Sequence, residues 1–232
     1  MTHRLISFAV LALMLVVIPL AGCSNSPWSS SNDTRSEPER LIDVSANVSE
    51  QMFRDPEYGK LVELVSRARG VLIFPSVLRG AFIFGARGGN GVLLARDAAG
   101  GWSAPAFYSI GGVNWGLQFG GQSQSIVIAI MTERGLNAIM NRRATLGVDA
   151  NVAAGPVGKS IAAQTGADWK ADMYAFAKSE GVFIGIALDG SIVWPRHEFN
   201  QQLYGASATP EGILLQNSFS SQRASQLIGV LP

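Results

Sequence analysis

The chain has 232 residues, of which 18 are Lys or Arg and 17 are Asp or Glu, so its formal net charge is only +1. This balance excludes a protein that relies on many basic residues to neutralise nucleic-acid phosphates. The single cysteine excludes an intramolecular disulfide, a redox pair and a cysteine-rich zinc site. The length suits one sizeable domain preceded by a short extra segment.

The first 23 residues have the layout of a cleavable secretory signal. An apolar run from Leu5 to Leu20 follows one basic residue, Arg4, and two small residues then precede Cys23. This pattern resembles the lipobox of bacterial lipoproteins, in which the cysteine is acylated and becomes the first residue. The alternative is an uncleaved membrane anchor, because the run approaches the ~20 apolar residues that span a bilayer. We predict a signal peptide at residues 1–22 and lipidation at Cys23.

The residues after Cys23 predict a tether and a location. Removing residues 1–22 leaves 17 basic and 17 acidic residues, a net charge of zero. By resemblance to the Gram-negative sorting rule, Ser24 in place of aspartate implies a bacterial envelope lipoprotein at the outer membrane, facing the periplasm or exposed at the surface. Residues 23–40 contain six serines and two prolines and are predicted to be a flexible linker.

The globular part, predicted to span residues 41–232, opens with two helices. Leu41, Val44, Val48 and Met52 form one helical stripe, and a core-facing stripe is commoner than a membrane-surface one. Asp55 is expected to cap a second helix with Pro56 at its first position, ending at Gly70. The predicted buried face of the second helix consists of Leu61, Leu64, Val65 and Ala68.

Beyond this helix the pattern changes to that of short strands. The predicted strands are Val71–Phe74, Ala81–Ala86, Val92–Arg96, Ser103–Ser109, Ser125–Met131, Met173–Lys178 and Val182–Leu188. Asn90-Gly91 and Asp189-Gly190 are typical of type I′ turns, and Ser179-Glu180-Gly181 is typical of a three-residue hairpin loop. Hairpins of this kind indicate an antiparallel sheet. Further helices are expected at Thr132–Asn141, after Pro195 and at Ser220–Ile228.

Glycines are concentrated in the strand region, with 13 of the 26 lying between Gly70 and Gly121. Glycine inside a strand weakens it, so this density indicates bulges, corners or close backbone approach, and less often a binding loop. The predicted fold is therefore α+β: a mainly antiparallel, strongly curved sheet, or a small barrel or sandwich, with N-terminal helices and a few short peripheral helices.

Several motifs follow one another in a fixed order. They are Gly-Val-Leu-Ile-Phe at 70–74, Gly-Gly-Asn-Gly-Val-Leu at 88–93, Trp-Ser-Ala-Pro at 102–105, Gly-Leu-Gln-Phe-Gly at 116–120, Ala-Ala-Gly-Pro-Val-Gly at 153–158, Gly-Val-Phe-Ile-Gly-Ile-Ala-Leu-Asp-Gly at 181–190, and Tyr204-Gly205. Their order and spacing resemble the SYLF domain over roughly residues 50–216.

The resemblance implies a non-enzymatic, phospholipid-binding domain, since eukaryotic SYLF members bind phosphoinositides and fungal ones also bind actin filaments. Bacterial members are commonly envelope lipoproteins described as lipid-binding. Many eukaryotic members carry basic residues before the Gly-Val-Phe strand, where this chain has Lys178, Ser179 and Glu180. Phosphoinositide selectivity and actin binding are therefore not carried over. The alternative is a structural or protein-interaction lipoprotein that binds no lipid.

The main alternative to lipid binding that the residues themselves suggest is a nucleotide-binding site. Residues 153–160, ending in Lys159-Ser160, match the loose form of a phosphate-binding loop, and Asp189 follows an apolar run as a magnesium ligand would. However, Asp189-Gly190 is expected to be a turn, and residues 161–168 have no amphipathic stripe. We interpret residues 153–160 as a structural loop.

No catalytic set is indicated. His197 with Ser191 or Ser207 would be a base and nucleophile, but a lone histidine at a helix start is commonly a capping or surface residue. Asp168 and Asp172 are four residues apart, as on a solvated helix face. We predict no enzyme activity, cofactor or metal.

A cluster of arginines is the candidate site for a lipid headgroup. Between Leu64 and Arg96 the chain has five arginines and no acidic residue: Arg67, Arg69, Arg79, Arg87 and Arg96. Arginine forks match phosphate oxygens well, although strand ends also project arginines into water. Arg79 and Arg87 are separated by an even number of residues, so an unbroken strand would place them on one face. The sequence thus predicts an anionic lipid as the partner, with protein partners unknown.

Overall fold

The computed structural model describes residues 34–81, 84–97, 99–115, 120–140, 143–155, 171–179, 182–183, 188–216 and 218–232. Ser36–Pro232 form one compact unit, and Met1–Arg35 form a separate one, of which only the last two residues are described. The predicted signal peptide and Cys23 therefore lie outside the described residues.

The described helices and strands of the compact unit have the following bounds. The helices are α2 (Glu37–Arg54), η1 (Pro56–Tyr58), α3 (Gly59–Arg67), α4 (Glu133–Met140), α6 (His197–Tyr204), α7 (Pro210–Leu214) and α8 (Ala224–Val230). The strands are β1 (Gly70–Ala81), β2 (Phe84–Ala95), β3 (Ala106–Trp115), β4 (Gly120–Ile130), β5 (Ala144–Thr145), β6 (Val152–Ala154), β7 (Met173–Ser179), β8 (Val182–Phe183) and β9 (Ile192–Pro195).

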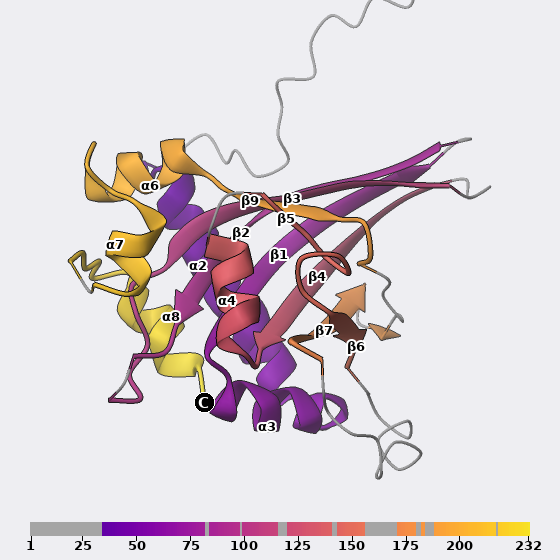
Figure 1. Ribbon diagram of the computed structural model, residues 1–232, viewed down its shortest axis with the longest axis horizontal. Coiled ribbons are helices and arrows are strands. Elements are labelled where there is room, and N and C mark those ends of the chain that lie inside the picture. The colour runs from indigo at the N-terminus through magenta and orange to yellow at the C-terminus, as the bar shows by residue number, and fades with distance from the viewer. Residues whose placement is uncertain are drawn as a thin grey trace, which may run out of the picture. The chain divides into compact units, whose positions relative to one another are not determined.

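All described strands belong to one sheet with the order β5-β9-β3-β2-β1-β4-β7-β6, and β8 pairs with β7. Neighbouring strands are antiparallel except β6 and β7, which are parallel. The sheet curls strongly, as a half-barrel, and the long strands β1–β4 cross its centre (Figure 1). The predicted α+β class with a curved, mainly antiparallel sheet is confirmed.

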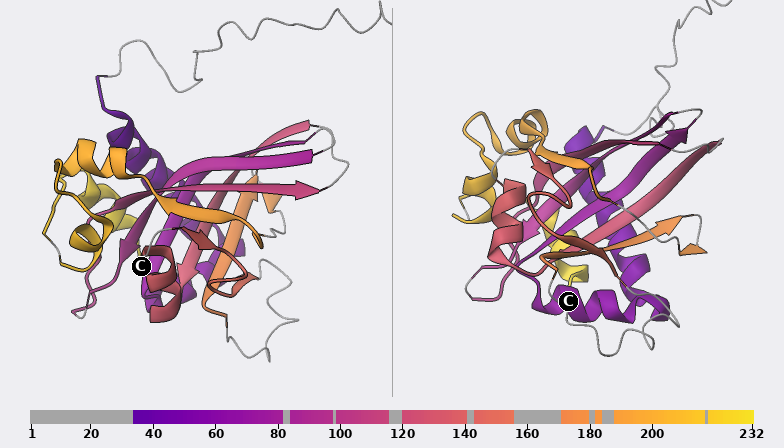
Figure 2. Two further views of the ribbon diagram at one scale, coloured as in Figure 1. Left: turned by 45° about the horizontal axis from the view of Figure 1, so that its top comes forward. Right: turned by 45° about the vertical axis from the view of Figure 1, so that its right-hand side comes forward.

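At the end of the sheet where the helices lie, both faces are buried, which explains the continuous apolar runs in that part of the strands. On β1, Leu72 and Phe74 join a core on one face, to which α4 and α7 also contribute. Val71 and Ile73 point the other way, into a core shared with α2, α3 and α8. The two views of Figure 2 show helices on both sides of the curled sheet. Each fully buried aliphatic side chain stabilises the fold by about 1.5–3 kcal/mol.

Helix α2 begins earlier than predicted and turns a different face inward. Ser36 and Glu39 form a reciprocal capping box, so residues 37–40 belong to the helix and not to the linker. Ile42, Ala46 and Met52 are buried, with Ser45 and Ser49 beside them, whereas the predicted Leu41, Val44 and Val48 are half-buried. The difference arises because α2 packs against β1, β2, α6 and α8 at once.

The second predicted helix is confirmed with a short 3-10 turn in front of it. Asp55 Oδ1 accepts a hydrogen bond from the Glu57 amide (3.1 Å), and Pro56 opens the turn η1. The predicted buried face is observed: Leu61, Leu64, Val65 and Ala68. Gly70 starts β1 and does not cap the helix.

The predicted hairpin at Asn90-Gly91 is wrong. Both residues lie inside β2, where Gly91 pairs with Tyr108 of β3. Asn90 has a tertiary role instead, because its Oδ1 accepts hydrogen bonds from Ser109 Oγ (2.8 Å) and Arg196 Nη1 (2.9 Å). The predicted strand at residues 81–86 is also wrong, since β1 ends at 81 and β2 begins at 84.

Glycine allows β2 to continue past a bulge in β1. The β1–β2 register shifts between Ile73 and Ser76. A Cβ at Gly91 would lie 2.2 Å from the Ile73 carbonyl oxygen, and one at Gly89 would lie 2.4 Å from that of Ser76. The architectural interpretation of the glycine cluster, as bulges and close backbone approach, is confirmed at these two positions.

The remaining elements match the sequence in part. The β7–β8 hairpin, α4 and α6 are confirmed, and Gly190 has the positive φ (75°) expected after Asp189. Helix α8 begins at Ala224, four residues later than predicted. Helix α7 was not predicted, because five residues are too few to show a helical period.

We expect Gly91→Ala to lower the free energy of unfolding by about 2 kcal/mol or more, because the new Cβ overlaps a backbone oxygen that no rotamer change can move. Gly88→Ala is the matched control in the same strand, since its Cβ would meet nothing nearer than 3.9 Å. Urea denaturation of both variants measures the difference. Equal midpoints for the two variants would contradict the close approach.

Candidate functional site

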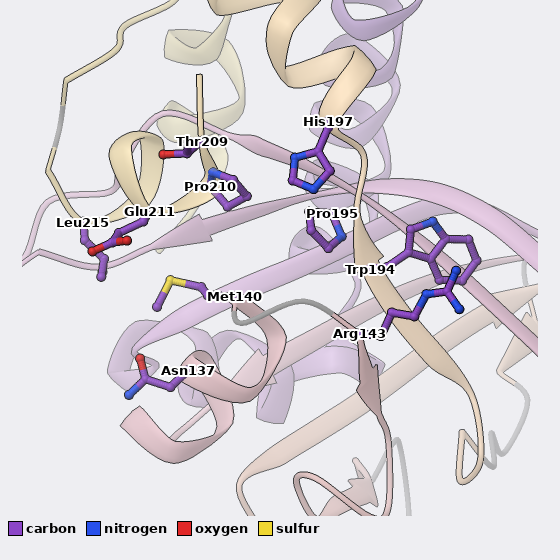
Figure 3. A pocket seen from close by; sticks show the side chains of 10 residues that line it. All are labelled: Asn137, Met140, Arg143, Trp194, Pro195, His197, Thr209, Pro210, Glu211 and Leu215. Atoms are coloured by element: carbon purple, nitrogen blue, oxygen red, sulfur yellow. The ribbon is translucent and has the colours of Figure 1, made fainter. Parts of the chain in front are cut away.

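The described surface contains a groove of about 630 Å³ between α4, β9, the start of α6, and α7 (Figure 3). This volume falls within the range of ligand-binding clefts in proteins. We call it the α4–α7 groove. Its lining residues are Asn137, Met140, Arg143, Trp194, Pro195, His197, Thr209, Pro210, Glu211 and Leu215.

The groove combines apolar surface with charges of both signs. Trp194 and Arg143 lie at one end, and Glu211 and Leu215 lie at the other (Figure 3). Arg143, Glu211 and Leu215 are exposed, and Trp194 is half-buried. A long, open cleft of this composition suits a segment of a larger molecule better than a small polar metabolite.

The edge of the sheet forms one wall of the groove. Only Ile192 and Val193 of β9 pair with β5, so the strand continues beyond β5 at Trp194 and Pro195. Proline suits such an edge because it has no backbone N–H to pair. The Trp194 ring lies against Gly111 of β3, where a Cβ would be only 2.9 Å from the indole.

Helix α7 forms the opposite wall and has its own cap. Thr209 Oγ1 accepts a hydrogen bond from the Gly212 amide (3.1 Å), and Pro210 occupies the first turn. The groove was not predicted from the sequence because helix α7, one of its walls, was not predicted. The Thr209-Pro210 dipeptide, a cap residue followed by a first-turn proline, was the signal that would have found it.

The structure separates the five predicted arginines into two groups. Arg79 and Arg87 share a face because they are direct cross-strand partners in β1 and β2, and not because they lie in one unbroken strand, which was the condition set by the sequence. Arg67, Arg69 and Arg96 lie around the other end of these strands, about 30 Å away at 3.3 Å per residue. The five residues do not form one surface.

The second group makes contacts within the fold. Arg67 Nη2 pairs with Glu63 (2.8 Å), and Arg69 Nη1 lies 3.8 Å from Glu133. Arg96 donates to the carbonyls of Val65 (3.1 Å), Ala68 (3.2 Å), Gly100 (2.9 Å) and Pro232 (3.0 Å) and stacks over Trp102. Arg96 thus ties the end of α3 to the sheet and to the C-terminal residues.

The alternative catalytic residues are not brought together. His197 is exposed at the first position of α6 and lines the groove, but neither Ser191, which is buried, nor Ser207, which is exposed, lines it. In the described part of the chain, no three His, Cys, Asp or Glu side chains are grouped to hold a metal ion. None of the described helices is both long and apolar enough to span a bilayer.

The candidate phosphate-binding loop is described only at its start. Residues 152–154 form β6, and a Phe176 ring atom lies 2.1 Å from where a Cβ on Gly155 would be. Residues 156–160, including Lys159, lie outside the described residues, as does Asp168. Asp189 occupies a turn, as the sequence predicted.

Asp172 is buried and links separate segments of the fold, so it does not lie on a solvated helix face as the sequence suggested. Its carboxylate accepts hydrogen bonds from Thr132 Oγ1 (2.7 Å) and the Asn151 amide (3.0 Å), and it forms an ion pair with Arg134. Burial by itself raises the pKa of this carboxyl, but the hydrogen bonds from Thr132 and Asn151 and the Arg134 charge outweigh it, so the pKa is lowered.

Comparison with known proteins identifies the family. Residues 111–232, more than half of the chain, match the family Ysc84, described as "Las17-binding protein actin regulator". The chain belongs to the Ysc84 family. This confirms the resemblance to the SYLF domain seen in the motifs.

Relatives of this Ysc84 domain occur in animals and yeast. The chain is 36% identical over 143 residues to the Xenopus laevis "SH3 domain-containing YSC84-like protein 1", covering 61% of this chain and 42% of the relative. The Bos taurus protein of the same name is 30% identical over 209 residues, covering 89% and 60%. Saccharomyces cerevisiae "LAS seventeen-binding protein 3" is 34% identical over 155 residues, covering 66% and 34%. The chain thus spans well under two thirds of each of these relatives.

The comparison contradicts two predictions made from the sequence. The family and its yeast relative are named for binding a protein, Las17, and the family for regulating actin, so the predicted partner, an anionic lipid reached through a lipid anchor, is wrong. These relatives come from animals and yeast, so the bacterial outer-membrane location inferred from residues 1–23 is wrong on the same finding. The prediction followed the leader-like pattern, Ser24 and the resemblance to bacterial lipoproteins.

We expect the free energy of unfolding to decrease at acidic pH because of Asp172. Because the folded pKa is lowered below the unfolded value of about 3.9, this carboxylate stabilises the fold above that value and ceases to do so as the pH falls through the folded pKa. Asp172→Asn should cost about 2 kcal/mol at pH 7 and flatten the pH dependence below about pH 4. Melting curves of wild type and variant between pH 7 and pH 2 test this; parallel curves would contradict it.

Proposed function

We propose that this chain is a non-enzymatic protein-binding module of the actin-regulatory type, and that the α4–α7 groove receives a segment of the partner. The family description, which names binding and regulation and no reaction, is the observation that carries the proposal. The groove supports it by position, because all its lining residues lie between 137 and 215, inside the matched region 111–232.

The lining of the groove has the composition of a protein-binding surface. Tryptophan, arginine and methionine are enriched where proteins bind one another, and the groove presents Trp194, Arg143 and Met140. The half-buried Trp194 ring supplies a rigid apolar contact, since Gly111 supports it from below. Arg143 and Glu211 give the two ends opposite charges, which would fix the direction in which a segment binds.

We expect the double variant Leu215→Gln, Arg143→Gln to weaken partner binding about tenfold, because it removes an apolar contact at one end and a charge at the other. Leu215 is 50% exposed and Arg143 is also exposed, so the fold should tolerate both changes. Co-sedimentation of the full chain with actin filaments, and its capture by immobilised Las17, measure the loss.

Val148→Gln is the matched control, since Val148 is 77% exposed and does not line the groove. Wild-type binding by the double variant to both proteins would exclude the groove as the interface. Phospholipid binding, the finer prediction from the sequence, is the competing outcome: a wild-type chain that binds anionic vesicles and neither protein would contradict the proposed function.

A further inference from the structure

The four long strands carry a charge pattern that the groove does not explain. Arg79 in β1 and Arg87 in β2 are the only charged residues in β1–β4, and none of these strands contains an acidic residue. The two arginines face each other directly across the β1–β2 pair. Like charges at directly opposed positions destabilise a sheet, so this placement carries a cost to folding.

The register extends this pair into a row of hydrogen-bond donors on three neighbouring strands, β4, β1 and β2. Arg79 pairs with Gln122 of β4, and Arg87 pairs with Gly112 of β3. Directly paired residues share a face, so Gln122, Arg79 and Arg87 point the same way. Gln124 is buried in the next row on this face, and its side-chain amide nitrogen has no hydrogen-bond partner in the described structure. We call Gln122, Arg79 and Arg87 the distal row.

The row is built partly below the surface. Arg87 is buried, Arg79 is half-buried and Gln122 is exposed. The Arg87 stem lies over Gly112, since a Cβ there would be in ordinary contact with Arg87 Cγ (3.5 Å) and in tighter contact with Ser191 Oγ (3.2 Å). Burial, and then the neighbouring Arg79 charge, lower the pKa of Arg87. An anion that approaches from the Arg79 and Gln122 side would relieve this repulsion.

The position of the row suits contact with a large partner. In Figures 1 and 2 the described helices gather around one end of the sheet, and the paired strands β1–β4 extend past them at the other. The row lies in this extension, and its residues are not among those that line the α4–α7 groove. It is therefore a second surface, independent of the groove.

We propose that the distal row binds the carboxylates of an acidic segment of a protein partner. The half-buried Arg79 guanidinium can hold a carboxylate by paired hydrogen bonds, and Arg87, on a neighbouring strand whose backbone runs about 5 Å away, adds a second positive charge beside it. The Gln122 amide adds a neutral donor at the exposed end. A protein source for the anion follows from the family, whose description names proteins as partners.

The test uses the full chain and a fluorescent oligoglutamate peptide, with binding followed by anisotropy at low salt. Arg79→Gln should weaken peptide binding about tenfold, the value of one charge-assisted hydrogen-bonded pair. Rising salt should reduce wild-type binding and have less effect on the variant. Arg67→Gln is the matched control, because Arg67 is an exposed arginine at the other end of the strands.

A second variant leaves both arginines in place and so avoids any effect of their loss on folding. Gln122→Glu puts a carboxylate beside Arg79 and should reduce peptide binding to a similar extent, whereas Gln202→Glu, at an exposed position of α6, should not. Peptide binding unchanged by Arg79→Gln and Gln122→Glu would overturn the proposal. Loss of binding to phosphatidylserine vesicles, with peptide binding unchanged, would overturn it in favour of a lipid headgroup.

Discussion

The close approach of β2 to the bulge in β1 is the constraint on which this sheet depends. Around the bulge, the backbone oxygens of Ile73 and Ser76 occupy the space where Gly91 and Gly89 would carry side chains. Bulges increase local twist, and glycine lets the neighbouring strand follow without steric overlap. Two twelve-residue strands can therefore run unbroken from the helical end of the molecule to its distal end. Arg79 and Arg87 of the distal row are carried by these continuous strands.

The sequence predicted the class of the fold well because class depends on short-range patterns. Alternation, hairpin residues and glycine density indicated a curved antiparallel sheet, and that is what forms. Strand ends were predicted poorly because Asn90-Gly91 fits a turn equally well. It stays inside β2 through pairing with β1 and β3 and through the hydrogen bonds to Asn90 from Ser109 and Arg196, none of which a local pattern specifies. The inward face of α2 likewise depends on four packing partners that no local pattern specifies.

At the candidate sites, as in the fold, local patterns could be predicted from the sequence and tertiary contacts could not. The sequence placed residues 79 and 87 on one face by their parity in a single strand, whereas the structure does so by pairing two strands. Proximity along the chain wrongly suggested that Arg67, Arg69 and Arg96 belong with them, because strands of this length carry nearby residues about 30 Å apart. The groove draws its walls from α4, which ends at Met140, and from β9 and α7, which begin at Ile192 and Pro210. Such a site has no signature in a single stretch of sequence.

Adjacent glycines on β3 show how one strand serves two surfaces. Gly111 lies beneath the Trp194 ring of the groove, and the stem of Arg87 of the distal row lies over Gly112. Successive residues of a strand point to opposite faces, so the two side chains pack against β3 from opposite sides. A side chain at 111 would displace the indole, whereas a Cβ at 112 would be tight against Ser191 Oγ (3.2 Å) and in ordinary contact with Arg87 Cγ (3.5 Å). The distal row lies on the face of the sheet whose core α4 and α7 complete, further along the strands, and none of its residues lines the groove.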